Sequence, residues 1–475
     1  MIGNKKTALT RLEAVLAVLF IVALIAAGAG WVRPVEMGVT TVTKTVGEGQ
    51  AATVTVTETQ QITVTETVVK QPEAPRKIKI GLLTHQTGPE APIGQDMERA
   101  FLLAVEEINT RGGVYVEEFG TKLLLEPVIE DQQSSREGTV AAAERLVNVD
   151  KVDIIVGGFG SAFIPGAQPI IAEAGTPYII TGVSTPIVVT RTDIDTSWFV
   201  LYQAIAPEHG QSISLILAEA VKPVVAPDRN LKVAVLYQDS PFGEGFFAGM
   251  KLIIEEKNLP IDLVFVDKFK VRETDFRALL TAAAAANPDV IVPIGFIGET
   301  IAVIQQGVRD LGIKKLYGPV CVCVESPTYY KDLGREGEFS LIQTYFGPYH
   351  VHPRVAEKVA EFSKKFEEKW GVRPGSQGLS VYDAVYIAVK AIEEAGTLDK
   401  AKVAEALRNL VMGELLLPVP GGVIKFKPTG HQTFELYGVQ LIWDENVQEL
   451  RPVIVWPKEI AEAEVRLPSG FQPGG

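Results

Sequence analysis

Two serine residues, Ser161 and Ser184, each follow a short apolar segment that is typical of a buried strand. The first segment, 152–156, leads into a glycine-rich turn that ends at Gly160, and the second, 178–180, leads into another turn. Because parallel strands of an open α/β sheet end at one edge, we expect both hydroxyls to lie there, where a helix start favours a carboxylate ligand. The alternative, in which Ser161 only caps a helix and the glycines only form a tight turn, stays open at this point.

The elements that would position these serines alternate between strand and helix along two successive stretches of the chain. Buried strands are predicted at 78–83, 123–129, 152–156 and 178–180, and then at 232–237, 263–266 and 290–293. Helices separate them, such as one that begins near Asp96 and ends before Gly112. This alternation predicts an α/β protein with largely parallel sheets, and two series of similar size predict two lobes with a cleft between them.

The last part of the chain has a different order of elements. Helices are predicted at 353–370 and 382–395, and strands without a crossover helix at 434–442 and 452–455. Residues 461–475 are predicted to form a flexible tail.

The N-terminus carries the pattern of a membrane-targeting segment. Positive residues within 1–11 precede an uncharged apolar run that is long enough nearly to span a hydrocarbon core of roughly 30 Å. A positive flank stays inside, so we predict a cytoplasmic tail at 1–11, an anchor at 12–32 and an extracytoplasmic remainder. Small residues at 27–29 resemble a cleavage site, so a cleavable signal peptide is the alternative.

Residues 33–75 are rich in threonine and contain no aromatic side chain. Threonine and valine alternate there without an obvious partner strand, which favours an extended stalk whose threonines are candidates for O-glycosylation. The alternative is an edge hairpin. A stalk after an anchor predicts a domain tethered at the cell surface.

Composition and motifs exclude several classes of protein. The formal net charge of −13 argues against nucleic acid as a partner, because its binding needs basic patches. Cys321 and Cys323 lie two apart on a predicted strand, where a bridge is geometrically awkward, and pairing them with His350 and His352 as a zinc set would join separate short segments. No Walker, GxSxG or HExxH motif occurs. We therefore predict no metal, no cofactor and no enzymatic activity.

Several segments, in a fixed order, resemble those of a known family. They are IKIGLLTHQTGP with Gly94, AVEEINTRGGV, VDIIVGGFGSAFIPGAQPIIAEAGTPYI, VAVLYQDSPFGEG and YDAVYIAVKAI. Through them the chain is similar, over roughly 77–458, to the branched-chain amino acid (leucine, isoleucine, valine) binding proteins of ABC importers, which have the type I periplasmic-binding-protein fold. The resemblance implies two lobes, each a mainly parallel sheet flanked by helices, that close on a ligand about their hinge.

The resemblance also implies the domain boundaries. The chain would cross between the lobes three times, near Ala206, Tyr345 and Glu435. The ligand-binding domain at 76–460 would then divide into a first lobe of about 76–206 and 346–435 and a second lobe of about 207–345 and 436–460.

Site residues follow from the same resemblance. In that family a serine at the Ser161 position, a hydroxyl at the Ser184 position and nearby backbone amides hold the ligand's carboxylate, which adds Gly160 and Gly182 to the expected site. The residues expected around the rest of the ligand are Ile93, Phe242, Phe296 and Tyr345. For each aromatic side chain, packing in the core is the alternative.

The ammonium half of the expected site departs from the family pattern. Members that bind α-amino acids carry an acidic residue after a Gly-Pro, where this chain has Val320 unless the register slips to Glu325. Glu208 matches another acidic position and is the expected substitute, since a buried ammonium without a carboxylate partner costs several kcal/mol. An apolar or aromatic acid, or an amide, fits the remaining residues about as well as leucine does.

The function implied is that of an extracytoplasmic binding protein that captures a small ligand and delivers it to ABC permease subunits. We expect a monomer that is held at the membrane by its N-terminal segment. The alternative is a receptor that reports a small amide or carboxylate to a signalling partner, because the fold alone does not separate transport from sensing.

Overall fold

The first lobe is built on a five-stranded parallel sheet with the order β4-β1-β5-β6-β7 in the computed structural model, which describes residues 76–318, 327–345 and 351–474. Its strands are β1 (Ile78–Thr84), β4 (Leu125–Asp131), β5 (Ile154–Phe159), β6 (Tyr178–Gly182) and β7 (Phe199–Leu201). Strands β5 and β6 are neighbours, and the turns that follow them carry Ser161 and Ser184.

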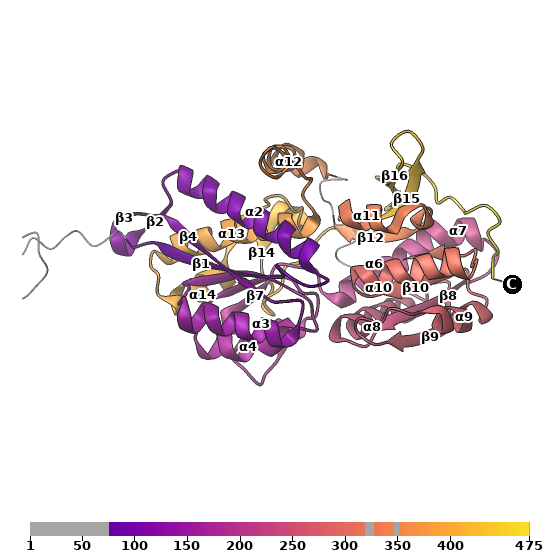
Figure 1. Cartoon of the computed structure of the whole chain (residues 1–475), viewed down its shortest axis with the longest axis horizontal. Helices are drawn as coiled ribbons and strands as arrows, with labels where there is room; N and C mark the ends of the chain where they lie inside the picture. Colours follow the sequence, from indigo (N-terminus) through magenta and orange to yellow (C-terminus); the bar gives the residue numbers. More distant parts are fainter. Residues whose placement is uncertain (1–75, 319–326, 346–350, 475) are drawn as a thin grey trace, which may run out of the picture. The chain divides into compact units, whose positions relative to one another are not determined.

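Helices cover both faces of this sheet. They are α2 (Ala91–Thr110), α3 (Arg136–Glu144), α4 (Ile164–Glu173) and α5 (Ile187–Thr190). Leu82 of β1 belongs to the core beneath α2, whereas its neighbour Leu83 belongs to the core shared with α3 and α4, because successive strand residues point to opposite faces. Figure 1 shows α2 on one side of β1 and α3 with α4 on the other.

Part of the first lobe comes from the C-terminal half of the chain. These elements are α12 (Ala356–Trp370), α13 (Ser376–Ala395), α14 (Lys400–Asn409), β13 (Val411–Gly413) and β14 (Val423–Lys425). Helix α13 packs against α2 and against β5 and β6, so it completes the cover of the sheet on the α2 side. A small hairpin of β2 (Val114–Val116) and β3 (Thr121–Leu123) follows α2.

The second lobe contains a four-stranded parallel sheet with the order β11-β10-β8-β9. Its strands are β8 (Leu231–Gln238), β9 (Ile261–Phe269), β10 (Val290–Ile294) and β11 (Leu316–Tyr317). Its helices are α6 (Ala206–Ile216), α7 (Lys222–Val225), α8 (Pro241–Glu256), α9 (Arg277–Ala285), α10 (Ile297–Gln305) and α11 (Pro327–Leu333). Val235 packs in the core with α6 and α8, and Leu236 packs in the core with α9 and α10.

An antiparallel sheet of β12 (Leu341–Tyr345), β15 (Leu436–Asp444) and β16 (Glu449–Trp456) joins this lobe through contacts with α6. The parallel sheets and their flanking helices are the architecture that the sequence predicts. The fold class is therefore confirmed.

The segment 461–474 differs from the flexible tail predicted for it. Val465 is buried in the core of the second lobe, and Leu467 and Phe471 pack against it. The Gly474 N–H donates to Asp289 Oδ1 at 2.6 Å, and Lys315 Nζ donates to the Gln472 carbonyl at 2.7 Å. Apolar side chains spaced through the tail thus hold it against the lobe, whereas its position at the chain terminus had suggested flexibility.

Several predictions concern residues outside the described ranges. These are the cytoplasmic tail, the anchor, the stalk, Val320, Cys321, Cys323 and Glu325. Among the residues that the structure does describe, no helix has both the length and the apolar character needed to cross a membrane.

Candidate functional site between the lobes

The end of β5 and the turn after it have a backbone that requires glycine. Gly158 and Gly160 have φ values of +81° and +97°, in the left-handed region that other residues rarely adopt. A Cβ atom on Gly158 would lie only 2.0 Å from the Tyr178 hydroxyl oxygen. The Gly160 N–H donates to the Gly182 carbonyl at 2.9 Å, which joins the ends of β5 and β6.

Ser161 accepts hydrogen bonds instead of capping α4. Its Oγ accepts the backbone N–H groups of Ser184 and Thr185, each at 3.2 Å, while α4 begins only at Ile164 with Phe163 at the N-cap position. The hydroxyl proton of Ser161 is therefore left to donate elsewhere. The interpretation of Ser161 as a simple helix cap does not describe this arrangement.

Ser184 carries a buried hydroxyl that lacks a partner. Its side chain is 1% exposed, and its Oγ has no hydrogen bond among the described residues. Since a buried polar group without a partner is destabilising, such a group indicates a place where a ligand or a water molecule binds.

A small cavity brings most of the predicted site residues together. Its volume is about 10 Å³, which is about the space of one water molecule. The residues that line it are Phe159, Gly160, Ser161, Gly182, Ser184, Phe242, Gly295 and Phe296. The first five come from the first lobe, and the last three come from α8 and the turn after β10 in the second lobe. Both lobes thus contribute walls to the same small space.

Phe296 closes this space through aromatic contacts across the lobes. Its ring centroid lies 6.2 Å from that of Phe159 and 5.8 Å from that of Phe163. Phe296 also lines a second, larger cavity of about 360 Å³, together with Ile93. The Phe296 side chain therefore stands at the wall between the two cavities.

The larger cavity lies between the start of α2 and the second lobe. Its described lining combines apolar residues with ionisable ones, which are Glu90, Arg272, Glu273, Glu299 and Asp332. The carboxylate of Glu299 accepts hydrogen bonds from the Phe296 N–H at 2.8 Å, the Gln238 side-chain amide at 2.7 Å and the Arg272 N–H at 2.5 Å. Glu299 therefore fixes the turn that carries Phe296.

Glu90 has a different environment in the same cavity. Its side chain is only 6% exposed, and no described residue donates a hydrogen bond to its carboxyl group. Burial, reinforced by the nearby charge of Glu299 and opposed by that of Arg272, raises the pKa of Glu90 to about 7.

A neutral histidine supports the strand end behind the small cavity. His85 Nδ1 accepts the Ser134 N–H at 3.0 Å, so its proton is on Nε2, which lies 3.2 Å from the Phe159 carbonyl and donates to it. Burial lowers the pKa of His85 to about 4, so the ring stays uncharged at neutral pH.

The structure places Glu208 away from both cavities. Its carboxylate accepts the Ile205 N–H at 3.4 Å and lies 3.4 Å from Lys427 Nζ, with His431 Nε2 at 3.7 Å. Although burial alone would raise the pKa of Glu208, these partners lower it below its ordinary value. Glu208 thus links α6 to a segment of the first lobe.

Tyr345 also lies outside both cavities, at the end of β12. Its hydroxyl accepts the Ala204 N–H at 3.0 Å and lies 3.0 Å from His209 Nε2, whose ring in turn contacts Gln343 at 2.9 Å. These residues join the end of β12 to the start of α6 and the loop before it, where the chain passes between the lobes.

Residues 77–445 match the family model described as periplasmic binding protein. The chain belongs to the periplasmic binding protein family. Among relatives of known name, it is 27% identical to the leucine-, isoleucine-, valine-, threonine-, and alanine-binding protein of Pseudomonas aeruginosa, over 82% of this chain and 92% of the relative. It is 25% identical to Leu/Ile/Val-binding protein homolog 7 of Brucella abortus, over 82% of this chain and 94% of the relative.

Solved structures show the same fold. A leucine binding protein from Thermotoga maritima has a TM-score of 0.66 at 21% identity, over 81% of this chain and 100% of that one. A solute binding protein from R. palustris in complex with benzoate has a TM-score of 0.63 at 17% identity, over 82% of this chain and 99% of that one. The predicted family is confirmed, and so is the prediction of a binding protein in place of an enzyme.

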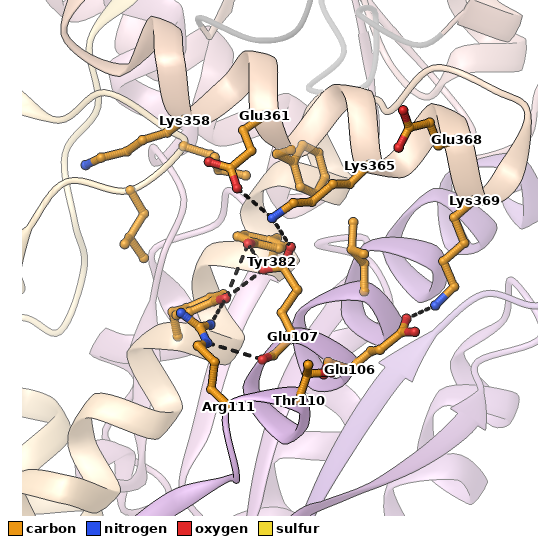
Figure 2. A pocket seen from close by; sticks show the side chains of 15 residues that line it. Glu106, Glu107, Thr110, Arg111, Lys358, Glu361, Lys365, Glu368, Lys369 and Tyr382 are labelled. Atoms are coloured by element: carbon orange, nitrogen blue, oxygen red, sulfur yellow. Dashed lines mark hydrogen bonds and ion pairs between the residues drawn. The ribbon is translucent and has the colours of Figure 1, made fainter.

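Another cavity of this periplasmic binding protein, of about 900 Å³, lies elsewhere, in a groove between α2, α12 and α13 (Figure 2). Several of its polar side chains pair with one another. Glu107 pairs with Lys365 at 2.8 Å and accepts hydrogen bonds from the hydroxyls of Tyr382 at 2.5 Å and Tyr386 at 2.8 Å. Burial alone would raise the pKa of Glu107, but these donors lower it below its ordinary value. Glu107 is therefore already engaged by its neighbours in the groove, unlike the Ser184 hydroxyl in the small interlobe cavity, which has no partner among the described residues.

Sequence reasoning missed some of the residues that line the two interlobe cavities. Phe159, Gly295, Arg272, Glu299 and Glu90 are absent from the predicted site. Of these, only Glu90 could have been identified from the sequence, because it is a single acidic residue among Gly88, Pro89, Pro92 and Ile93, where α2 begins.

Proposed function

We propose that this periplasmic binding protein is the extracytoplasmic solute-binding component of an ABC importer and captures an apolar amino acid or a related small carboxylate between its lobes. The observation that carries the proposal is the pair of buried hydroxyls of Ser161 and Ser184 at neighbouring strand ends. The Ser161 hydroxyl has a proton to donate, and the Ser184 hydroxyl has no partner among the described residues.

Ser161 and Ser184 suit a carboxylate for a chemical reason. A carboxylate accepts several hydrogen bonds, and bonds to a charged group contribute about 1.5–3 kcal/mol each, roughly twice as much as neutral ones. Gly160 and Gly182 bring the backbone close without side chains in the way. The carboxylate would therefore enter where the small cavity now has room for about one water molecule.

Phe242 and Phe296 supply the opposite wall from the second lobe. A ligand that contacts both lobes stabilises the closed arrangement through contacts that the open one lacks. Because the cavity of about 10 Å³ is too small for an amino acid, binding requires Phe296 or the lobes to move. Ile93, which lines the larger cavity together with Phe296, would contact the ligand's body.

The relatives support this class of ligand. One is named for binding leucine, isoleucine, valine, threonine and alanine, and solved structures of the same fold hold isoleucine or benzoate. All of these ligands carry a carboxylate. Delivery to a membrane permease, and retention of the protein at the membrane by residues 12–32, complete the proposal.

A thermal-shift titration of the full-length chain tests it. A ligand selective for the folded state raises the unfolding midpoint as RT ln(1 + [L]/Kd), so leucine, isoleucine, valine and benzoate can be compared with their amides. We expect at least one carboxylate to stabilise the protein and Ser184→Ala to weaken that ligand by about tenfold, the equivalent of 1.4 kcal/mol.

Ser212→Ala is the matched control. Ser212 is also a buried serine whose Oγ has no hydrogen bond among the described residues, but it lies in α6 and lines neither cavity. If both variants bind the carboxylate like the unchanged protein, Ser184 does not belong to the site. If no carboxylate stabilises the chain, the proposed ligand class is wrong.

A further inference from the structure

The larger interlobe cavity has an acidic lining. Of the described residues that surround it, Glu90, Glu273, Glu299 and Asp332 carry carboxyl groups, and Arg272 is the basic one. The Arg272 side chain is exposed, and its guanidinium lies 5.8 Å from the centre of the Phe163 ring without an ion pair to a described residue. The balance of charge inside the cavity therefore favours a positive guest.

Glu90 is distinguished from the other acids because it is buried and also lacks a hydrogen bond to its carboxyl group, whereas Asp332 is exposed. Glu299 is held by several hydrogen bonds, and Glu273 accepts the N–H groups of Thr274 at 2.9 Å and Asp275 at 3.2 Å. Glu90 is more than nine-tenths buried, lines the cavity and has no hydrogen bond to its carboxyl group from any described residue. A buried acid in this situation is stabilised by a cation or a hydrogen-bond donor brought by a ligand.

The cavity also has the apolar surface that an aliphatic ligand needs. Ile93, Phe296, Ile297 and Ile301 line it beside Glu90, and its volume of about 360 Å³ is within the range of small-molecule sites. Because Phe296 lines this cavity and also the one with Ser184, a single ligand that displaces the Phe296 ring would reach both.

We propose that Glu90 accepts the ammonium group of the ligand, so that the protein takes molecules that carry an ammonium as well as a carboxylate. This inference rests on the proposed function, in which Ser161 and Ser184 hold the carboxylate. It gives Glu90 the role that the sequence had suggested for Glu208, whose carboxylate is already engaged by Lys427 and His431.

Paired ligands that differ only in the amino group test the role of Glu90. Binding of leucine is compared with that of 4-methylpentanoate, and binding of 5-aminopentanoate with that of pentanoate, by calorimetry on the full-length chain at pH 8. The first pair reports an ammonium next to the carboxylate, and the second reports a distant one. We expect the amino member of at least one pair to bind about tenfold more tightly.

Glu90→Gln should abolish that preference, because it removes the charge and keeps the shape. We expect the amino member to lose about tenfold in affinity and the deaminated acid to change by less than about threefold. Glu90→Asp should retain part of the preference, since it keeps the carboxylate. Glu273→Gln, in the same cavity, is the control and should keep the full preference.

A pH series adds a second measurement. The titratable and charged groups that line the cavity with Glu90 are Glu299, Glu273, Asp332 and Arg272, and the charges of Glu299 and Arg272 act on Glu90 directly. Because protonation of Glu90 removes its charge, affinity for the amino member should fall between pH 8 and pH 6 in the unchanged protein but not in Glu90→Gln.

The outcomes separate this inference from the proposed function. If carboxylates bind through Ser184 but Glu90→Gln keeps the full preference for the amino member, or no preference exists, the inference is wrong and the proposed function stands. If neither member of either pair binds, the inference is wrong, and the proposed function is wrong as well only if no other carboxylate, such as benzoate, stabilises the chain.

Discussion

The Oγ atom of Ser161 accepts the backbone N–H of Ser184 at 3.2 Å, across the ends of two neighbouring parallel strands. This bond holds the two turns together, and it turns the Ser161 proton away from the backbone. Ser184 contributes its N–H to that bond while its own hydroxyl has no partner among the described residues. The two serines are therefore equal in residue type but unequal in structural role.

Their substitution should separate stability from binding. Ser161→Ala leaves the N–H groups of Ser184 and Thr185 without their acceptor, so we expect it to lower the free energy of unfolding by about 1–3 kcal/mol. Ser184→Ala removes a hydroxyl without a partner and should change the free energy of unfolding little, although it should lower the affinity for a carboxylate ligand. Chemical denaturation of the full-length chain without ligand measures both. Equal losses would contradict the different roles assigned to them.

Phe296→Ala should join the two interlobe cavities. The ring is nearly buried and separates them, so its removal should lower the free energy of unfolding by roughly 3–5 kcal/mol while it admits bulkier ligands. Phe296→Leu keeps most of the volume and is the control. Calorimetry with leucine and with a bulkier amino acid such as phenylalanine measures the change in preference, and an unchanged ratio of the two affinities would show that Phe296 does not limit ligand size.

Glu90→Gln should make the folded protein more stable at high pH. Burial raises the pKa of Glu90 to about 7, whereas a glutamate in an unfolded chain has a pKa of about 4.3. The stability that comes from its protonated form is complete below pH of about 4 and is lost as the pH rises through about 7.

Glutamine cannot ionise, so the variant should match the unchanged protein near pH 4 and exceed its free energy of unfolding by on the order of 1–3 kcal/mol at pH 8. Denaturation curves at both pH values measure the difference. Glu273→Gln serves as the comparison, because its carboxylate accepts backbone N–H groups. If the difference in free energy of unfolding between Glu90→Gln and the unchanged protein does not grow with pH, Glu90 ionises in the folded protein as easily as in the unfolded one.

Tyr345→Phe should weaken the connection between the lobes. The change removes the acceptor of the Ala204 N–H and the contact with His209, so we expect a loss of about 1–3 kcal/mol in the free energy of unfolding. Tyr317→Phe is the control, because the buried Tyr317 hydroxyl has no hydrogen bond among the described residues. Two equal losses would argue against a specific role of the Tyr345 hydroxyl.

The order of strands and helices and the position of the two serines that we propose to bind the carboxylate are determined by local patterns in the sequence. Apolar segments of strand length, separated by helices, lead to parallel sheets, and parallel strands bring the residues after Phe159 and Gly182 to one edge. Glycines with positive φ then leave little choice in the backbone that presents Ser161. Each of these steps depends on neighbours in the chain, which is why the sequence was enough to predict them.

Only the tertiary structure determines that the carboxylate of Glu208 is already paired and that the carboxylate of Glu90 is free to bind a ligand. Glu208 pairs with Lys427, 219 positions away, and Glu90 meets Glu299 and Arg272 only because the two lobes come together around the cavity. The charge state and the partners of a buried carboxyl group depend on side chains from distant segments, and no local pattern carries that information. For the same reason the packing of the tail at Val465 and the position of the Phe296 ring between two cavities follow from the folded lobes and not from the residues beside them.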